Sequence, residues 1–151
     1  SIFCTAAYDR CYCPGEQLRS QPQIWMPDER RHYPLSLNHL MHWIELNNLD
    51  QLNQIRELSR QRPQVIFKHS TRCSVSSMAL NRLQRAEVSA SADFYLLDLL
   101  RFRSVSDQVA DDFSVHHESP QVLLIKNGEC IYDESHTGIG MADILEQISL
   151  S

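Results

Sequence analysis

The segment from residue 65 to residue 77 restricts the fold of this chain most, because it places a cysteine between a strand and a helix. Residues 65–67 are branched or aromatic and predict a short buried strand. A polar turn follows, then Cys73, and then apolar residues at helical spacing. The first-turn amides of a helix lack partners within the helix and attract negative charge, which favours the reactive thiolate form of a cysteine there. The competing interpretation is a buried cysteine that packs as a small hydrophobic residue.

From residue 49 onward, the sequence predicts alternating helices and strands. The expected elements are a helix over 49–58, a strand over 64–68, a helix after residue 73, a strand over 94–99, a helix after residue 104, strands over 122–125 and 129–132, and a helix over 141–148. Asn127 and Gly128 form a strong signal for a two-residue hairpin between the last two strands. This order predicts an α/β fold with a central mixed four-stranded sheet and helices on both faces.

Capping residues and apolar faces define the expected helices further. Asn48 or Asp50 is expected to cap the first helix, and Ser104 the third. The expected buried faces comprise Leu49, Leu52, Ile55 and Leu58, then Val75, Met78, Ala79, Leu83 and Ala86, then Val105, Val109 and Phe113, and finally Met141, Ile144, Leu145 and Ile148. We expect Lys68 at a strand end with its amine in water, and Cys130 in the core.

Composition argues against several classes of protein. The chain has 151 residues, a formal net charge of −5 and 42% hydrophobic residues. These values suit one globular domain with an appendage, and they argue against a disordered chain or a nucleic-acid partner. The five cysteines are odd in number and irregularly spaced, so a secreted disulfide framework is not expected. We expect no membrane span, no signal peptide and a cytoplasmic location.

Residues 1–40 differ in character from the rest of the chain. They contain four of the six prolines and lack a sustained helical or strand period. We expect an irregular N-terminal extension here and a compact domain over residues 41–151. Cys4, Cys11 and Cys13 lie in this extension, where their thiols are either incidental or able to resolve an intermediate at Cys73.

Four short segments, one of which contains Cys73, together carry a family resemblance. The four segments are Phe-Lys-His-Ser-Thr-Arg-Cys-Ser-Val-Ser at 67–76, His-Glu-Ser-Pro-Gln at 117–121, Lys-Asn-Gly at 126–128 and Ser-His at 135–136. Together they resemble the YtxJ family, bacillithiol-system redox proteins also called monothiol bacilliredoxins. The resemblance covers residues 41–151 and implies a thioredoxin fold, one active cysteine and exchange with a low-molecular-weight thiol. Family members commonly begin near residue 41, so residues 1–40 are expected to be a variable appendage or an over-extended reading frame, which is not native.

The resemblance also implies roles for individual residues. Cys73 matches the family's active cysteine, and Ser76 matches the position where dithiol relatives carry a second cysteine. Ser119 and Pro120 match a loop whose proline is cis and whose preceding residue offers backbone groups to an extended substrate. His136 matches a histidine that follows the hairpin and lies near the thiol. Ser74 departs from the proline that members often carry, which loosens the first helical turn but leaves the thiol chemistry intact.

A monothiol mechanism follows from Cys73 paired with Ser76. Cys73 takes the small thiol from a mixed disulfide on a client protein, and a second small thiol then releases it. Ser76 either donates a hydrogen bond to the thiolate or faces solvent. Arg72 either stabilises the thiolate and binds carboxylates of the small thiol, or is a solvated loop residue. His69 either adds a further positive charge or caps backbone groups in the turn.

Two other functions remain as alternatives, namely a non-catalytic binding module and a monothiol protein that carries an iron-sulfur cluster. The leading expectation is an enzyme with no bound cofactor, bacillithiol or a similar small thiol as co-substrate, and bacillithiolated proteins as clients. We expect no nucleic-acid or membrane partner. A metal site is also not expected, because the adjacent His116 and His117 would point to opposite sides of an extended segment.

Overall fold

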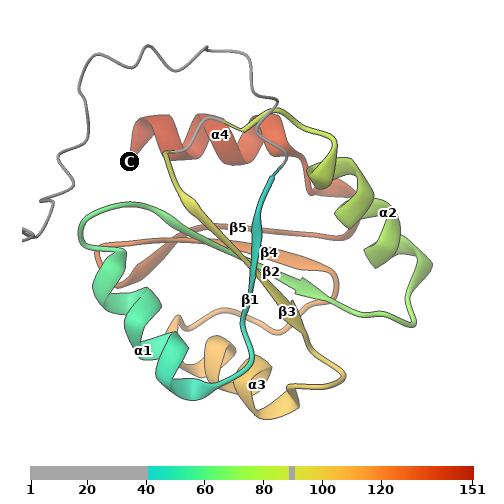
Figure 1. Cartoon of the computed structure of the whole chain (residues 1–151), viewed down its shortest axis with the longest axis horizontal. Coiled ribbons are helices and arrows are strands. Elements are labelled where there is room, and N and C mark those ends of the chain that lie inside the picture. The colour runs from blue at the N-terminus through green and yellow to red at the C-terminus, as the bar shows by residue number, and fades with distance from the viewer. Residues whose placement is uncertain (1–40, 89–90) are drawn as a thin grey trace, which may run out of the picture. The chain divides into compact units, whose positions relative to one another are not determined.

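A computed structural model of the protein describes residues 41–88 and 91–151, which form five strands, four α-helices and one short 3₁₀ helix (Figure 1). The elements in chain order are β1 (Trp43–Glu45), α1 (Leu49–Leu58), β2 (Gln64–His69), α2 (Ser74–Gln84), β3 (Asp93–Asp98), α3 (Arg103–Asp112), β4 (Gln121–Lys126), β5 (Glu129–Ser135), η1 (His136–Gly138) and α4 (Met141–Leu150). The expected extension over residues 1–40 lies outside the described residues.

The sheet is mixed and has the strand order β1-β3-β2-β4-β5. Strand β3 runs parallel to both β1 and β2, whereas β4 runs antiparallel to both β2 and β5. The prediction of a mixed sheet is confirmed, but its four-strand count is wrong because β1 adds a fifth strand. With only three residues at the sheet edge, β1 is too short to show an alternating pattern in the sequence.

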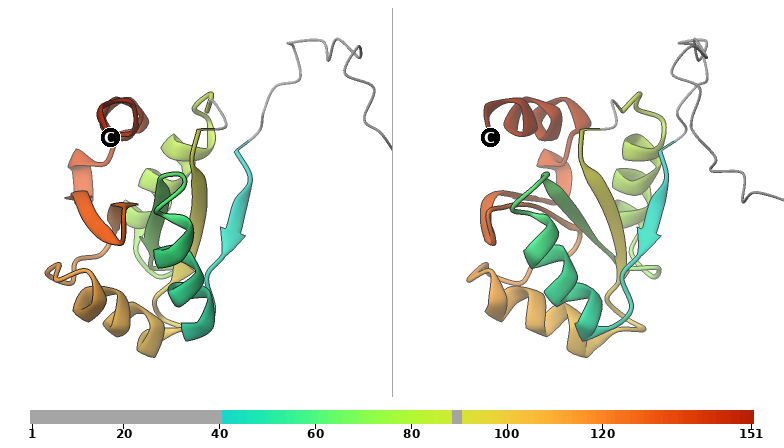
Figure 2. Two further views of the ribbon diagram at one scale, coloured as in Figure 1. Left: turned by 90° about the vertical axis from the view of Figure 1, so that its left-hand side faces the viewer. Right: turned by 60° about the vertical axis from the view of Figure 1, so that its left-hand side comes forward.

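Helices cover both faces of the sheet, with α2 and α4 on one side and α1 and α3 on the other (Figures 1 and 2). Strand β2 is buried at all six positions and supplies both cores. Its Val65 and Phe67 pack with α2 and α4, and the intervening Ile66 packs with α1 and α3. Burying a side chain such as Phe67 contributes roughly 1.5–3 kcal/mol, so burial of this central strand stabilises the position of the turn that follows it.

The helix starts agree only partly with the sequence. Asn48 caps α1 by accepting a hydrogen bond from the amide of Gln51 at 2.8 Å, as one of the two expected caps. The prediction of Ser104 as the cap of α3 is wrong, because that helix already begins at Arg103, after Phe102. The Asp98 carbonyl accepts the amide of Phe102, and this turn brings the start of the helix forward.

The buried face of α2 agrees only in part with the predicted one. Ala79 and Leu83 are buried as predicted, and Ala86 is half-buried. Val75 and Met78 are instead 38% and 64% exposed, and Ser76 is buried. The sheet therefore contacts the side of α2 that carries a serine, a fact that apolar spacing alone does not predict. The apolar face expected for α3 is buried as predicted, and so are three of the four residues expected for α4; Leu145 is half-buried. In α1, Leu52 and Ile55 are buried, but Leu49 and Leu58 are exposed.

The hairpin between β4 and β5 turns at Asn127 and Gly128, as predicted. Their φ angles are +52° and +84°, in the left-handed region that a two-residue hairpin turn requires. Strand β5 continues to Ser135, three residues beyond the predicted return strand. This extension brings His136 back to the edge of the sheet where β4 begins, because Gln121 pairs with Ser135. None of the helices in the described part of the chain is long and apolar enough to cross a membrane.

Candidate functional site

Two loops adjoin the sheet at the same end of two neighbouring strands, β2 and β4. Strand β2 ends at His69 and β4 begins at Gln121, and Lys68 pairs with Gln121 across the two strands. Residues 70–73, here called the cysteine turn, follow β2, and residues 116–120, here called the proline loop, precede β4. Because the two strands are direct neighbours, their register places both loops at one end of the molecule.

Cys73 is the N-cap residue of α2, at the strand-to-helix junction expected from the sequence. Its amide donates to the carbonyl of Ser70 at 3.1 Å, and its carbonyl accepts the amide of Ser77 at 3.1 Å. The side chain is half-buried, is a free thiol and makes no capping hydrogen bond to the helix. The sulfur is therefore held by its backbone at the positive end of α2 and remains open to a reaction partner.

Ser76 is buried beneath the cysteine turn and does not face solvent. Its hydroxyl oxygen accepts the amide of Ser70 at 3.0 Å and lies 2.7 Å from Nδ1 of His69. Burial lowers the pKa of His69, and the nearby Asp98 carboxylate opposes this shift. A neutral His69 can accept the Ser76 proton at Nδ1, so both hydrogen bonds recorded for Ser76 fasten the turn to the strand rather than to the sulfur.

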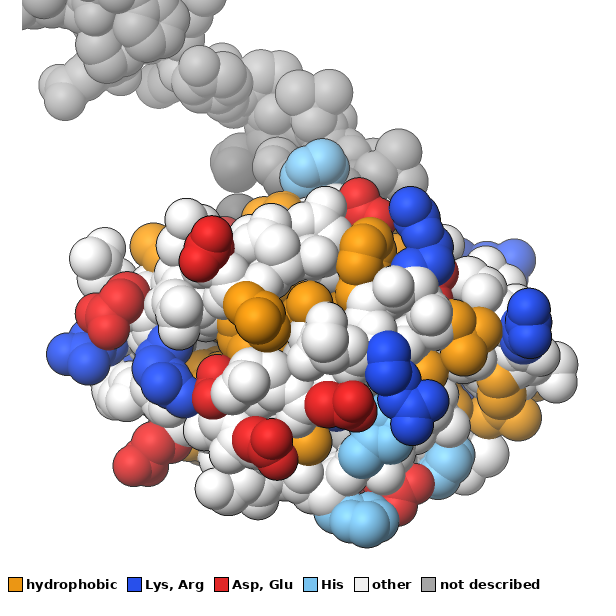
Figure 3. Space-filling model, turned by 90° about the horizontal axis from the view of Figure 1, so that it is seen from below, with side chains coloured by type: hydrophobic (Ala, Val, Ile, Leu, Met, Phe, Trp, Pro, Cys, Tyr) orange, Lys and Arg blue, Asp and Glu red, His pale blue; other side chains and the backbone are white. Residues whose placement is uncertain are grey.

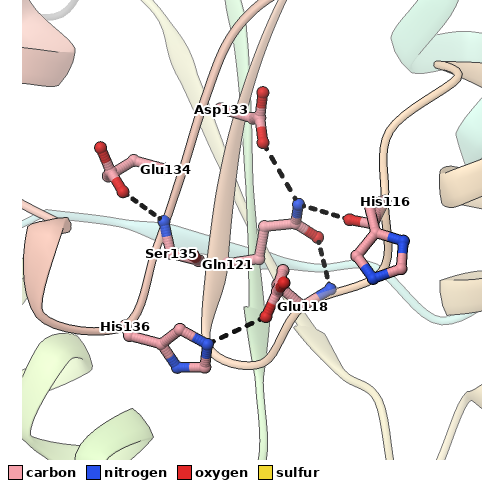
Figure 4. A network of polar contacts seen from close by, with 7 residues as sticks. All are labelled: His116, Glu118, Gln121, Asp133, Glu134, Ser135 and His136. Carbon is pink, nitrogen blue, oxygen red and sulfur yellow. Dashed lines mark hydrogen bonds and ion pairs between the residues drawn. The ribbon is translucent and has the colours of Figure 1, made fainter.

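The proline loop contains a cis peptide bond between Ser119 and Pro120, as the family resemblance implied. Pro120 is buried, and its carbonyl accepts the amide of His136 at 3.0 Å. The His136 ring is exposed, and its Nε2 lies 2.9 Å from Oε2 of Glu118 (Figure 4). His136 also begins η1, which packs against α2. These contacts bring His136 to the proline loop and to the helix that carries Cys73.

Arg72 lies in the cysteine turn immediately before Cys73 and is exposed. Within residues 41–88 and 91–151 its guanidinium forms no ion pair, so the charge is available to a bound anion. Figure 3 views the molecule from below and shows most of its visible histidine side chains near the lower edge of that face, whereas acidic and basic side chains are spread across it. The hydrophobic side chains on the same face are interspersed with polar and charged ones.

The sequence prediction that placed the amine of Lys68 in water is wrong. The residue is 0% exposed, and its Nζ lies 3.3 Å from Nδ1 of His117 in the proline loop. Burial lowers the pKa of Lys68 to about 8, against the opposing charge of Asp107. Strand β2 is central and covered on both faces, so its last residues cannot reach water as an edge strand would.

Three further polar residues at this edge were not predicted from the sequence. His117, Glu118 and Gln121 hold the proline loop through side-chain contacts. The sequence does contain a signal for these residues, namely a charged or amide residue at the end of an otherwise apolar strand, as at Lys68 and Gln121. In the part of the chain that the structure describes, no three His, Cys, Asp or Glu side chains are grouped so as to hold a metal ion.

Cys130 lies far from the cysteine turn. It pairs with Ile125, four residues along β4 from Gln121, which is about 13 Å in a strand. The side chain is half-buried rather than in the core, and burial raises the pKa of its thiol to about 11. A thiol so placed is protonated at neutral pH and does not reach Cys73. Cys4, Cys11 and Cys13 lie outside the described residues.

Comparison with known proteins agrees with this geometry. The sequence model of a family described as monothiol bacilliredoxin BrxC matches residues 44–144. A solved candidate oxidoreductase with a thioredoxin fold is 29% identical, with a TM-score of 0.61 over 68% of this chain and 90% of that one. The Malassezia sympodialis thioredoxin is 16% identical, with a TM-score of 0.61 over 79% and 97% of the two chains. The Trypanosoma brucei brucei thioredoxin is 12% identical, with the same TM-score over 74% and 95%. The fold is therefore thioredoxin-like, as predicted.

Proposed function

Because this chain belongs to the monothiol bacilliredoxin family, we propose that it removes bacillithiol, or a similar small thiol, from mixed disulfides on client proteins. Its fold and family are those of thiol redox proteins, and the finer assignment concerns substrate and direction. The observation that carries the proposal is Cys73 as the N-cap of α2, at the sheet edge where the cis Ser119–Pro120 bond also lies. Both loops are then available to one extended substrate.

The first step transfers the small thiol to the protein. The thiolate of Cys73 attacks the small-thiol sulfur of the client's mixed disulfide, a bond forms between these two sulfurs, and the client sulfur leaves as thiolate. The leaving thiolate takes a proton from water. The positive end of α2 favours the attacking anion before the reaction. The number of disulfide bonds is unchanged, so no outside oxidant or reductant is consumed.

The second step regenerates Cys73. The thiolate of a second small-thiol molecule attacks the small-thiol sulfur held on Cys73 and leaves as the small-thiol disulfide, so that Cys73 is again a thiolate. Ser76 supports this external route, because its hydroxyl cannot form a disulfide and is engaged by His69 and Ser70. The distance to Cys130 supports it as well.

Substrate binding is assigned to the exposed groups around Cys73. Arg72 is proposed to bind carboxylates of the small thiol, and the Ser119 backbone to pair with the client chain on either side of its modified cysteine. His136 is proposed to line the same site from the end of the hairpin. In this proposal the small thiol is a co-substrate, no cofactor stays bound, and the protein acts in a reducing cytoplasm, where a free Cys73 persists.

The test measures release of bacillithiol from a bacillithiolated protein by the wild type, Cys73→Ser and Cys130→Ser. Wild type and Cys130→Ser should release it at the same rate, and Cys73→Ser should not release it above the uncatalysed rate. Full activity in Cys73→Ser would disprove the mechanism. A coloured purified protein that lacks this activity would favour the iron-sulfur alternative.

A further inference from the structure

We propose that Lys68 and Gln121 are positioning residues, which hold the proline loop in place from inside the sheet and so set how tightly the client chain binds beside Cys73. This inference rests on the proposed function for its kinetic consequence, but the contacts themselves can be tested without a substrate.

The two residues face each other in the sheet. Lys68 in β2 pairs with Gln121 in β4, and both are 0% exposed. Directly opposite residues of an antiparallel pair project from the same face, with their Cβ atoms about 5 Å apart. The amine and the amide therefore form one buried polar floor at the start of β4, directly below the proline loop.

Each of the three residues that open the proline loop is bound by this floor. Gln121 Nε2 donates to the carbonyl of His116 at 2.9 Å, and its Oε1 accepts the amide of Glu118 at 3.3 Å (Figure 4). Lys68 Nζ lies 3.3 Å from Nδ1 of His117, between those two residues in the chain. Gln121 Nε2 is in turn 3.5 Å from a carboxylate oxygen of Asp133 in β5, which steadies the amide.

The amine of Lys68 has few charged neighbours to compensate its burial. Burial lowers the pKa of Lys68 to about 8, and Asp107 of α3 acts in the opposite direction. On the loop side, burial lowers the pKa of His117, helped by Lys68 and Arg103, while Asp107 and Glu118 oppose this. A neutral His117 accepts from the Lys68 ammonium at Nδ1, so the contact is strongest below the pKa of Lys68.

This arrangement stabilises the fold less than an apolar side chain at the same position would. A buried ammonium that donates to a neutral ring costs more free energy than an apolar side chain of the same shape. A role in holding the loop explains why an amine occupies a position that a methionine would fill. The contact also lies next to His136, because Glu118 carries the ion pair with that ring.

The test compares Lys68→Met with the wild type and with Lys126→Met, the chain's other lysine, which is half-buried at the far end of β4. The substrate is a peptide with bacillithiol on its cysteine. We expect Lys68→Met to lower kcat/KM by about tenfold, mainly through KM, because a misplaced binding group weakens productive binding. Alkylation of Cys73 by iodoacetamide should stay within about twofold of wild type, since the small reagent needs no loop. Lys126→Met should match the wild type in both assays.

A second measurement follows the His117 ring by NMR. Removing the Lys68 charge should raise the pKa of His117, while Lys126→Met should leave the ring signals unchanged. An unchanged His117 titration in Lys68→Met would show that the contact is absent and overturn the inference. A raised pKa with unchanged kcat/KM would overturn the positioning role. If the wild type itself releases no small thiol, the proposed function fails. In that case the inference stands only if Lys68→Met and Gln121→Met speed hydrogen exchange at the Glu118 amide, and it falls if they do not.

Discussion

Replacing Lys68 by methionine should make the protein more stable at neutral pH. Methionine keeps the length of the side chain within the core and removes an amine that is fully buried. The pKa of Lys68 falls from 10.5 to about 8, and each pKa unit corresponds to 1.36 kcal/mol. The buried ammonium therefore costs about 3 kcal/mol at pH 7, from which about 1 kcal/mol is subtracted for the hydrogen bond to His117. We expect Lys68→Met to gain about 2 kcal/mol in free energy of unfolding at pH 7.

The sign of the pH dependence follows from the same shift. Between about pH 8 and pH 10.5 the unfolded chain keeps the Lys68 proton while the folded protein has lost it, so wild-type stability rises with pH in this window. The cost of the amine falls from about 3 to about 1 kcal/mol by pH 10. The advantage of Lys68→Met should therefore shrink by about 2 kcal/mol between pH 7 and pH 10.

Urea unfolding at pH 7, 8, 9 and 10, on wild type, Lys68→Met and Lys126→Met, measures this difference directly. The comparison cancels the other groups that titrate in the window, among them Cys130 and the two tyrosines with raised pKa values, Tyr95 and Tyr132. A constant difference between wild type and Lys68→Met across this range, or a variant less stable than wild type at pH 7, would refute the reasoning.

Three further changes have expected outcomes. Ser76→Ala leaves Nδ1 of His69 and the amide of Ser70 without their shared partner, so the free energy of unfolding, measured in urea, should fall by about 1–3 kcal/mol. A loss below about 0.5 kcal/mol would show that these two hydrogen bonds contribute little. Gly128→Ala puts a Cβ at a φ of +84°, where it meets only Arg56 Cγ at 3.6 Å, so backbone strain alone should cost about 1 kcal/mol by thermal unfolding; no loss would contradict the turn geometry. His136→Ala breaks an exposed ion pair with Glu118 and should change stability by less than about 1 kcal/mol while raising KM for the modified peptide, and an unchanged KM would remove His136 from the site.

The fold was predictable from residue 49 onward because its elements carry strong local signals. The alternation of apolar segments, the cap at Asn48 and the Asn127–Gly128 turn each follow from neighbouring residues. Strand β1 was missed because an edge strand of three residues depends on β3 for its conformation. The start of α3 was misplaced because a backbone contact to Asp98 determines it.

The candidate site was predictable to a lesser extent. Cys73 and the proline loop follow from local sequence and family resemblance, whereas the partners of Ser76 and Lys68 depend on which face of an element meets the sheet. Helical spacing placed Ala79 and Leu83 correctly on the buried face of α2 but added Val75 and Met78, and only the packed structure turns Ser76 inward. Whether a lysine is exposed at a strand end likewise depends on what covers that strand, and β2 is central and buried at all six positions.

The most direct test of the proposed mechanism is the mass of the protein after the first step, with no free small thiol added. Wild type, Cys130→Ser and Cys73→Ser are each mixed with a bacillithiolated client, quenched with acid and analysed intact and as peptides by mass spectrometry. The mechanism predicts one added small-thiol group on Cys73 in wild type and in Cys130→Ser, and an unmodified Cys73→Ser. The client protein itself attached to Cys73, or the small thiol found on Cys130, would contradict it.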